Sequence, residues 1–461
     1  MSFSDLTFLF YFLPLFFAVY YIVPFRFKNT VLVLGSAAFY FLGAGVRDCV
    51  LLGASVVLHY ALARGMEGRT LRARRALLVF GLCVDLFGLV YFKYAAFLLE
   101  NLGKLTGTAF SLVELALPLG ISFYLFQSVG YLIDVSRGRP AEKSFVDFSA
   151  FVLAFPQLTM GPILRYDEWR GALKSRTIAR EDVFLGFECF AVGLCFKVLL
   201  ADQLAPLWAS LERIGYGYLS TPLAWLGAVS YSLQLYFDFS GYSLMAMGLG
   251  QMLCLPVPRN FDLPYLSRSV SEFYRRWHIT LGTWFRDYVY IPLGGSRNGK
   301  ARTVLSLSVV WVFTGLWHGA SWNFVLWGVV LLCCILLEKF CIGGFLKKHA
   351  LLSHLYLLFV IPQTWVIFRI TRLSDVGAYF SRLFPFFGTH SAVSAQDALK
   401  LLSSYWWLLL LAVLFCLPQP RRFYEKHRGS LALDLPLFLL FWVCVYFIAT
   451  SSGNAFLYSR F

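Results

Sequence analysis

Two histidines in the C-terminal half of the chain lie inside or beside long apolar runs. His278 belongs to the run SEFYRRWHIT, which begins at Ser271, and His318 belongs to GLWHGA, which begins at Gly315. Histidine can accept and return a proton near physiological pH, because its unperturbed pKa is about 6.5. Ionisable residues at membrane depth are costly and by default mark a functional site. These two histidines are therefore the first candidates for acid–base chemistry.

His318 follows one apolar run, 303–317, and precedes another, 320–341. We expect it to lie well inside a membrane, away from the basic loop that precedes the two runs. Gly315 and Gly319 leave room there for a substrate or for a closely approaching backbone. Burial favours the neutral, proton-accepting form of histidine, which suits a general base. The alternative is a structural histidine that is hydrogen-bonded between helices.

Three arginines near His278 are candidates for holding an anionic donor. They are Arg275, Arg276 and Arg286. Guanidinium groups match phosphate and carboxylate geometry, although contact with lipid headgroups explains most membrane arginines. Asp238, an acid within an apolar run, is a candidate supporting residue that orients a histidine, or it pairs with a buried arginine or hydroxyl.

The remaining ionisable residues of the apolar runs are interpreted as structural. The lone charges are Asp85, Lys93, Asp134 and Lys197, and the histidines without a comparable setting are His59, His349, His354, His390 and His427. None of the spacings among the ten cysteines resembles a metal site, and a buried cysteine is commonly a small hydrophobe. We therefore expect no metal.

The composition predicts a membrane protein. The chain has 461 residues, of which 59% are hydrophobic and 14% charged, whereas a soluble domain has about 25% charged residues. A spanning helix needs about 20 predominantly apolar residues, and backbone groups in hydrocarbon must be satisfied internally. The sequence therefore predicts an all-α, polytopic membrane protein with re-entrant and interfacial helices and roughly twelve transmembrane helices. The predicted runs are 6–24, 30–45, 49–63, 76–98, 109–134, 183–203, 222–253, 303–317, 320–341, 351–371, 404–418 and 431–450.

The positive charge of the chain indicates its orientation in the membrane. The formal net charge is +15, and it is concentrated in short loops, which is the positive-inside pattern rather than a nucleic-acid surface. Loops 64–75 and 421–428 are predicted to be cytoplasmic, and 373–403 to lie outside. Both termini are then extracytoplasmic. Run 6–24 lacks a basic flank before it and a cleavage site after it, so we expect a retained helix.

The whole chain, 1–461, is predicted to form a single integral-membrane domain. Segment 144–163 has basic residues on both sides and contains Pro156, which breaks a helix, so it is predicted to be re-entrant. Segment 254–302 is amphipathic, rich in arginine and punctuated by prolines, which favours a cytoplasmic interfacial region. Segment 451–461 is predicted to be an extracytoplasmic C-terminal tail.

Ordered motifs along nearly the whole chain resemble those of the membrane-bound O-acyltransferase (MBOAT) family, in its bacterial alginate O-acetyltransferase branch. The motifs are YFKY at 91–94, LPLGISF at 117–123, YLID at 131–134, FPQ at 155–157, GP at 161–162, DFSGY at 238–242, PRNF at 258–261, the run 271–295, and GLWHGASWN at 315–323. The resemblance implies that His318 is the catalytic histidine. It also implies that His278 takes a second polar position near the reaction centre.

The resemblance further implies an acetyl transfer for O-acetylation of an extracytoplasmic polysaccharide, such as alginate or another cell-envelope glycan. The donor substrate is acetyl-CoA or an acyl carrier thioester, which enters from the cytoplasm, and no cofactor is bound. Trp317 or backbone N–H groups would stabilise the oxyanion. The expected location is the bacterial cytoplasmic (inner) membrane. The expected partners are the bilayer, an SGNH-hydrolase-like extracytoplasmic transferase and, through it, the polysaccharide, with no nucleic acid.

The C-terminal tail 451–461 is apolar and aromatic, which is unusual for an exposed tail. The Tyr458 hydroxyl could accept the acyl group and pass it to the partner transferase, or the tail could only dock that partner. A function of another class also fits part of the sequence. A multi-spanning transporter or flippase for a lipid-linked glycan would explain the re-entrant segments and the basic face, but not the deep histidine with its glycine flanks.

Overall fold

A computed structural model describes residues 1–108, 110, 116–387 and 394–450 of the chain. These residues form helices, and the only β-type pairing within the described part of the chain is an isolated bridge between Phe261 and Trp277. The all-α prediction is therefore confirmed for the described part of the chain. Contacts group its residues into two compact units: unit 1 holds 1–190, 242–258 and 448–450, and unit 2 holds 191–241 and 259–447. The single-domain organisation remains a prediction.

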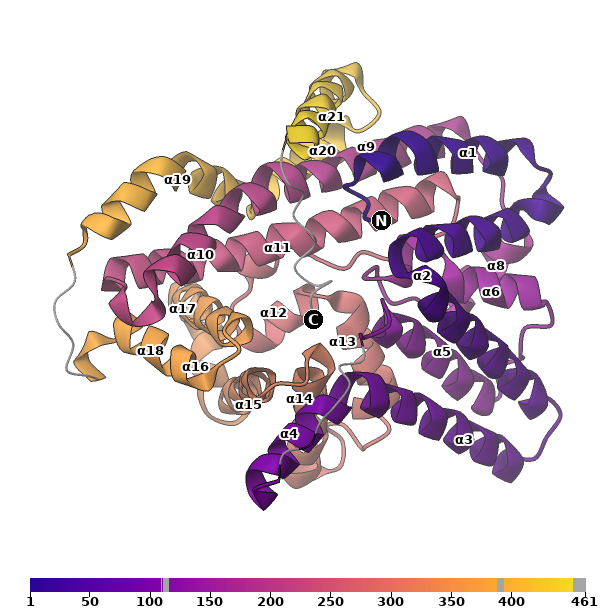
Figure 1. Cartoon of the computed structure of the whole chain (residues 1–461), viewed down its shortest axis with the longest axis horizontal. Helices are drawn as coiled ribbons and strands as arrows, with labels where there is room; N and C mark the ends of the chain where they lie inside the picture. Colours follow the sequence, from indigo (N-terminus) through magenta and orange to yellow (C-terminus); the bar gives the residue numbers. More distant parts are fainter. Residues whose placement is uncertain (109, 111–115, 388–393, 451–461) are drawn as a thin grey trace. The chain divides into compact units, whose positions relative to one another are not determined.

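Unit 1 is built on long helices from the first part of the chain. Its helices are α1 (Leu13–Ile22), α2 (Phe25–Met66), α3 (Leu71–Leu89), α4 (Ala95–Thr106), α5 (Ile121–Ser136), α6 (Phe145–Leu153), α7 (Phe155–Leu158) and α8 (Tyr166–Lys174). Three helices, α9 (Arg180–Cys195), α11 (Thr221–Met252) and α21 (Leu431–Thr450), contribute residues to both units. In unit 1, α2, α3, α5 and α6 pack against one another (Figure 1).

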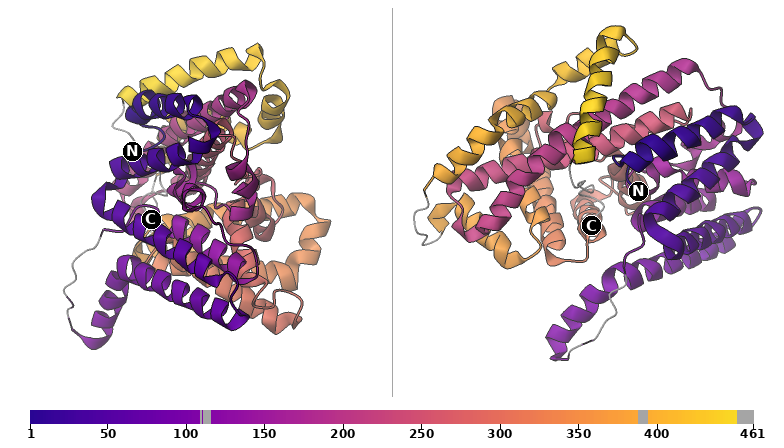
Figure 2. Two further views of the ribbon diagram at one scale, coloured as in Figure 1. Left: turned by 90° about the vertical axis from the view of Figure 1, so that its right-hand side faces the viewer. Right: turned by 45° about the horizontal axis from the view of Figure 1, so that its top comes forward.

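The structure joins apolar runs that the sequence analysis separates. Runs 30–45 and 49–63 both lie in α2, which is 42 residues long and has one non-helical residue, Gly45, at φ 80°. Glycine has no Cβ and adopts this conformation without steric cost. Figure 2 shows α3 running on into α4, and together they form one helix of 36 residues, Leu71–Thr106, that includes the π-helical segment Val90–Tyr94.

Seven helices among the described residues are long and apolar enough to cross a membrane. They are Phe25–Met66, Leu71–Thr106, Arg180–Ile214, Trp322–Lys348, Ala350–Arg369, Gln396–Phe415 and Leu431–Thr450. A multi-pass membrane protein is therefore supported, whereas the count of twelve spans is not confirmed.

The helix of segment 144–163 breaks in the middle. The helix α6 ends at Leu153, and α7 begins at Phe155 with Pro156 in its first turn. A proline is accepted there because the first N–H groups of a helix have no intrahelical partner. The Phe155 ring packs 5.6 Å from that of Phe39 in α2. The depth of this segment in a bilayer remains a prediction.

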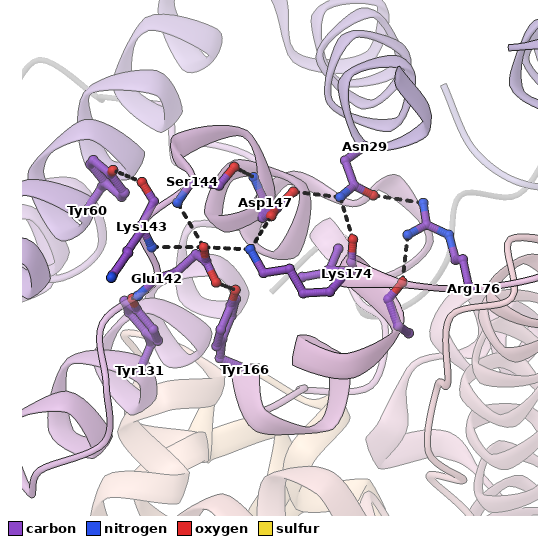
Figure 3. Close-up of polar contacts among 12 residues, drawn as sticks. Asn29, Tyr60, Tyr131, Glu142, Lys143, Ser144, Asp147, Tyr166, Lys174 and Arg176 are labelled. Atoms are coloured by element: carbon purple, nitrogen blue, oxygen red, sulfur yellow. Dashed lines mark hydrogen bonds and ion pairs between the residues drawn. The ribbon is translucent and has the colours of Figure 1, made fainter. Parts of the chain in front are cut away.

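A polar network ties the start of α2 to α6 and α8 in unit 1 (Figure 3). Lys174 Nζ lies 2.7 Å from Glu142 Oε1 and 2.6 Å from Asp147 Oδ2. Asn29 donates to Asp147 and to a carbonyl of α8, and Arg176 donates to Asn29 Oδ1 at 2.8 Å. Burial opposes the charged form of Glu142, but hydrogen bonds from Lys174 and the backbone outweigh it and leave the pKa of that carboxyl below its usual value.

Unit 2 contains the segment with the two candidate histidines. Its further helices are α10 (Asp202–Ile214), α12 (Val270–Arg276), α13 (Ile279–Phe285), α14 (Gly299–His318), α15 (Trp322–Leu337), α16 (Gly343–Lys348), α17 (Ala350–Arg369), α18 (Leu373–Leu383), α19 (Gln396–Phe415) and α20 (Pro418–His427). The helices α14 and α15 pack closely against each other, α17 packs on α15, and α12 contacts both α15 and α17 (Figure 1).

Segment 254–302 consists of short helices, as the prolines predict. Besides α12 and α13 it contains the 3₁₀ turn Pro264–Leu266 and the π-helical segment Arg286–Tyr290. Glu338 of the π-helical segment after α15 caps the start of α12, where its Oε2 accepts from the Ser271 backbone N–H at 2.9 Å. The part of the segment from Arg259 onward is thus anchored within unit 2, and the interfacial placement of the segment remains a prediction.

Candidate active site

His318 is the last residue of α14, at the turn that leads into α15. The two helices approach closely through glycines: a Cβ on Gly315 would lie 2.5 Å from the Phe324 carbonyl oxygen, and a Cβ on Gly328 would lie 2.6 Å from that of Trp311. Neither distance leaves room for a side chain. The sequence offers two reasons for glycine near His318, room for a substrate and a closely approaching backbone. At Gly315 the structure shows the closely approaching backbone.

The His318 side chain is enclosed by aromatic rings and is 5% exposed. Its ring centroid lies 4.7 Å from that of Trp317, and 5.0 Å from those of both Trp327 and Phe368. These rings come from α14, α15 and α17. A side chain at Gly319 would collide with an aromatic ring of α15. The His318 ring is therefore surrounded mainly by aromatic side chains, and its depth in a membrane remains a prediction.

His278 lies between α12 and α13 and is 4% exposed. Its φ is 48°, a left-handed conformation that is uncommon outside glycine and that costs free energy unless the fold imposes it. Its Nδ1 lies 3.2 Å from Asn260 Oδ1, and the ring meets Phe239 edge to face at 4.7 Å. Its buried Nε2 has no hydrogen-bond partner among the described residues. Burial lowers the pKa of His278 to about 3, so the ring is neutral at physiological pH.

Trp317 connects the two histidines. Its ring centroid lies 6.1 Å from that of His278 and 4.7 Å from that of His318. Residues 278 and 318 are forty positions apart in the sequence, and the turn after α12 and the end of α14 bring them to the same indole. The structure therefore brings together three of the residues that the sequence predicts for the site.

The three arginines differ in their surroundings. Arg276 pairs with Glu272 at 2.8 Å, and Arg286 pairs with Asp287 at 2.7 Å. Arg275 is exposed and, within the described chain, has no carboxylate at ion-pair distance. Arg275 is therefore the member of the set that is most available to an anionic ligand.

Asp238 pairs with a lysine rather than with a histidine. Lys197 Nζ lies 2.7 Å from both Asp238 Oδ1 and Asp202 Oδ1, and Lys197 and Asp238 are 1% and 2% exposed. The interpretation of Lys197 as a lone charge is therefore wrong. Asp238 precedes Phe239, whose ring packs on His278. The Lys197–Asp238 pair thus fixes the helix that carries Phe239, and a direct role of Asp238 in orienting a histidine remains a prediction.

Two further features of the structure were missed by sequence reasoning. The sequence indicates Asn260 only as part of a motif, whereas in the structure its amide contacts His278. The sequence indicates no role for His59, whereas in unit 1 its Nε2 lies 3.0 Å from Asp85 Oδ2. Both pairs join residues that are far apart along the chain, so no local spacing indicates them. Tyr458 and the tail 451–461 lie outside the described residues, and so do 109, 111–115 and 388–393. Within the described residues no cluster of three or more His, Cys, Asp or Glu is placed to bind a metal ion.

Comparison with known proteins identifies the class of protein to which this fold and this buried histidine pair belong. The model of the MBOAT, membrane-bound O-acyltransferase family matches residues 82–374, more than half of the chain. The chain therefore belongs to the membrane-bound O-acyltransferase family, and it is an O-acyltransferase of multi-pass membrane type.

The chain is also similar to individual proteins with named activities. The chain is 40% identical to "Probable alginate O-acetylase AlgI" of Azotobacter vinelandii over 84% of this chain and 78% of that protein. It is 40% identical to the protein of the same name from Pseudomonas aeruginosa, over 84% and 75% of the two chains. It is also 30% identical to the "Peptidoglycan O-acetyltransferase" of Helicobacter pylori, over 100% and 98%.

Proposed function

We propose that this chain transfers an acetyl group from a cytoplasmic thioester, acetyl-CoA or an acyl carrier thioester, for O-acetylation of an extracytoplasmic polysaccharide. Alginate or another cell-envelope glycan would be the final acceptor. The names of the relatives support acetyl as the group and a glycan as the acceptor. The observation that carries the proposal is a pair of buried histidines that meet at Trp317, one of which has a ring nitrogen with no hydrogen-bond partner in the part of the chain that the structure describes.

In the proposed reaction a hydroxyl oxygen attacks the carbonyl carbon of the thioester. A histidine takes the hydroxyl proton, the new C–O bond forms, and the C–S bond breaks. The thiolate then leaves with the proton that the histidine returns, so that an ester and a free thiol result. The sequence prediction gives this proton transfer to His318, and the free Nε2 gives His278 the geometry for the same task. Arg275 would hold the anionic part of the donor.

The assay is transfer of labelled acetyl from acetyl-CoA by the purified protein in micelles. We expect His318→Ala and His278→Ala each to lower kcat about 10²–10⁴-fold, the range for loss of an acid–base group. His427→Ala is the matched control, because His427 is only half-buried and lies on α20 of the same unit. If both histidine variants keep wild-type turnover, neither His318 nor His278 carries out the proposed proton transfer. The larger loss identifies the histidine that moves the proton.

We propose that the chain lies in the bacterial inner membrane and crosses it roughly twelve times. Loops 64–75 and 421–428 would face the cytoplasm, and both termini would be extracytoplasmic. The support for this orientation is the distribution of Lys and Arg along the chain. A single cysteine placed at position 390 should react with an impermeant thiol reagent from outside. Reaction only from the cytoplasm would reverse the proposed orientation.

The proposed partner is an SGNH-hydrolase-like transferase that receives the acyl group outside. Tyr458 either relays the group through its hydroxyl or belongs to a docking tail. Tyr458→Phe keeps the aromatic ring and removes the nucleophile. Loss of acceptor acetylation with retained partner binding would support the relay. If both survive, the tail is a docking element.

A further inference from the structure

The orientation of the Asn260 amide follows from its contacts with Thr280. Asn260 Oδ1 lies 3.2 Å from the Thr280 backbone nitrogen and 3.0 Å from Thr280 Oγ1. A backbone N–H can only donate a hydrogen bond, so the amide atom that faces it must be the oxygen rather than the nitrogen. Asn260 is fully buried, and its amide is therefore held in one orientation by the residue two positions after His278.

The same oxygen decides where the proton of His278 lies. Asn260 Oδ1 is 3.2 Å from His278 Nδ1, and an amide oxygen can only accept. His278 Nδ1 must therefore carry a hydrogen. A neutral imidazole has a single N–H, so its other nitrogen, Nε2, holds a lone pair. That nitrogen is buried and has no partner within the described residues.

Backbone contacts hold the two sides of this arrangement in register. The Ile279 N–H donates to the Asn260 carbonyl at 2.9 Å, and the Asp262 N–H donates to the Arg276 carbonyl at 2.9 Å. An isolated antiparallel bridge joins Phe261 and Trp277 between them. The short pairing keeps the left-handed conformation of His278 in place, because the peptide groups on both of its sides are fixed.

We infer that Asn260 is a positioning residue for acyl transfer: its amide oxygen holds His278 in the Nδ1–H tautomer and leaves Nε2 as a proton acceptor for the reacting hydroxyl. The catalytic consequence rests on the proposed function, whereas the tautomer does not. A neutral amide suits this task, because it fixes the tautomer without the negative charge that would favour the imidazolium form.

The tautomer can be measured without turnover. In full-length protein with ¹⁵N-labelled histidine in micelles, wild type at neutral pH should show His278 with a protonated Nδ1 and an unprotonated Nε2. The signals are assigned by their absence in His278→Gln. A proton on Nε2 of the wild-type ring would overturn the inference, whatever the activity of the enzyme.

The kinetic test separates positioning from general support of the fold. Asn260→Ala should lower kcat at least tenfold with a smaller change in donor KM, because the aligned lone pair is lost while the donor site remains. Asn260→Asp keeps the acceptor and the tautomer but favours the protonated ring, so activity should return at alkaline pH, with the acid limb of kcat at least one pH unit higher. Equal losses in both variants at every pH would overturn the positioning role.

Two controls keep the test decisive. Thr280→Val removes one hydrogen-bond donor to Asn260 but keeps the backbone N–H, so kcat should fall less than in Asn260→Ala. An equal or greater fall would contradict the proposed orientation of the Asn260 amide by Thr280. Asn101→Ala removes a part-buried asparagine of α4 in unit 1 and should leave kcat at the wild-type value. If Asn260→Ala does not fold, the pH profile of Asn260→Asp carries the test alone. Absence of acetyl transfer by wild type, with the tautomer as inferred, would contradict only the proposed function.

Discussion

Two buried histidines, one in each unit, have the same residue type and nearly the same exposure, but their ring nitrogens are used differently. In unit 1, His59 is 0% exposed, its Nδ1 lies 2.7 Å from the Ser55 carbonyl, and its Nε2 lies 3.0 Å from Asp85 Oδ2. In unit 2, the one hydrogen-bond partner of the His278 ring among the described residues is the neutral amide of Asn260, and no described residue contacts its Nε2 by a hydrogen bond.

The difference shows that burial alone does not identify a reactive histidine. Both nitrogens of His59 face oxygen atoms of the protein, a backbone carbonyl and a carboxylate, so both are engaged within unit 1. The His59–Asp85 pair joins α2 to α3 and has no ring position left for a substrate. His278 keeps one ring nitrogen available, and that nitrogen lies near Trp317 and His318. Four measurements test this comparison.

The largest expected effect is on turnover. His278→Ala should lower kcat about 10²–10⁴-fold, whereas His59→Ala should leave kcat per folded molecule within about threefold of wild type, because no substrate reaches its nitrogens. Labelled acetyl transfer, normalised to folded protein by size-exclusion chromatography, measures both. A loss of turnover in His59→Ala as large as that in His278→Ala would break the comparison.

The next effect is on stability, where substitution of His59 rather than of His278 should cause the larger loss. His59→Leu leaves Asp85 buried without its partner, which costs about 3–5 kcal/mol. The double variant His59→Leu/Asp85→Leu should recover most of that loss, because no isolated charge remains. Denaturant unfolding in micelles measures the difference. A single variant as stable as wild type would show that the pair is not structural.

A third effect is the pH dependence that His278 gives to stability. Burial holds its pKa at about 3 in the folded protein, whereas in the unfolded chain it is about 6.5. The unfolded state therefore binds the proton first, and stability falls as the pH falls below about 6.5. From pH 7.5 to 5.5 the contribution of His278 should fall by about 1.4 kcal/mol. His278→Gln should lack this component, and an identical pH dependence in wild type and variant would contradict the neutral, buried ring.

The smallest effect concerns the arginine beside His278. Arg275→Glu should raise the donor KM about fivefold, roughly 1 kcal/mol, with little change in kcat, which is the mark of lost uniform binding. Arg268→Glu is the matched control, because Arg268 is also exposed and precedes the same short helix. Equal donor KM values in the two variants would show that these arginines act only through the general positive charge of the surface and not through a contact with the donor.

The sequence predicts those parts of the molecule that depend on composition and local pattern. Apolar runs predict the helices, and prolines predict the break near Pro156 and the short helices after Met252. His318 is found where the apolar runs place it, at the end of α14. The motifs predict the residues of the candidate site, and the structure adds that the rings of His278 and His318 both lie beside Trp317.

Other parts depend on contacts between distant segments, which local patterns do not contain. Asn260 contacts His278 although a 3₁₀ turn and α12 lie between them in the sequence, and Lys197 contacts Asp238 from another helix. The span count is limited for a different reason. A hydrophobic run shows that a segment favours lipid, but α2 joins two such runs across Gly45, and hydropathy does not distinguish a kink from a loop.

The polar network at the start of α2 has a consequence for biosynthesis. Asn29 finds its partners at Asp147, Leu173 and Arg176, which are 118, 144 and 147 residues further along the chain. At about 5–20 residues per second, a ribosome needs roughly 6–30 s to synthesise that stretch. Until Asp147 has been synthesised the Asn29 amide has none of these three partners, and the last of them, Arg176, follows 29 residues later. The nascent chain can therefore insert α2 early, but it can complete the packing of unit 1 only after α8 has emerged.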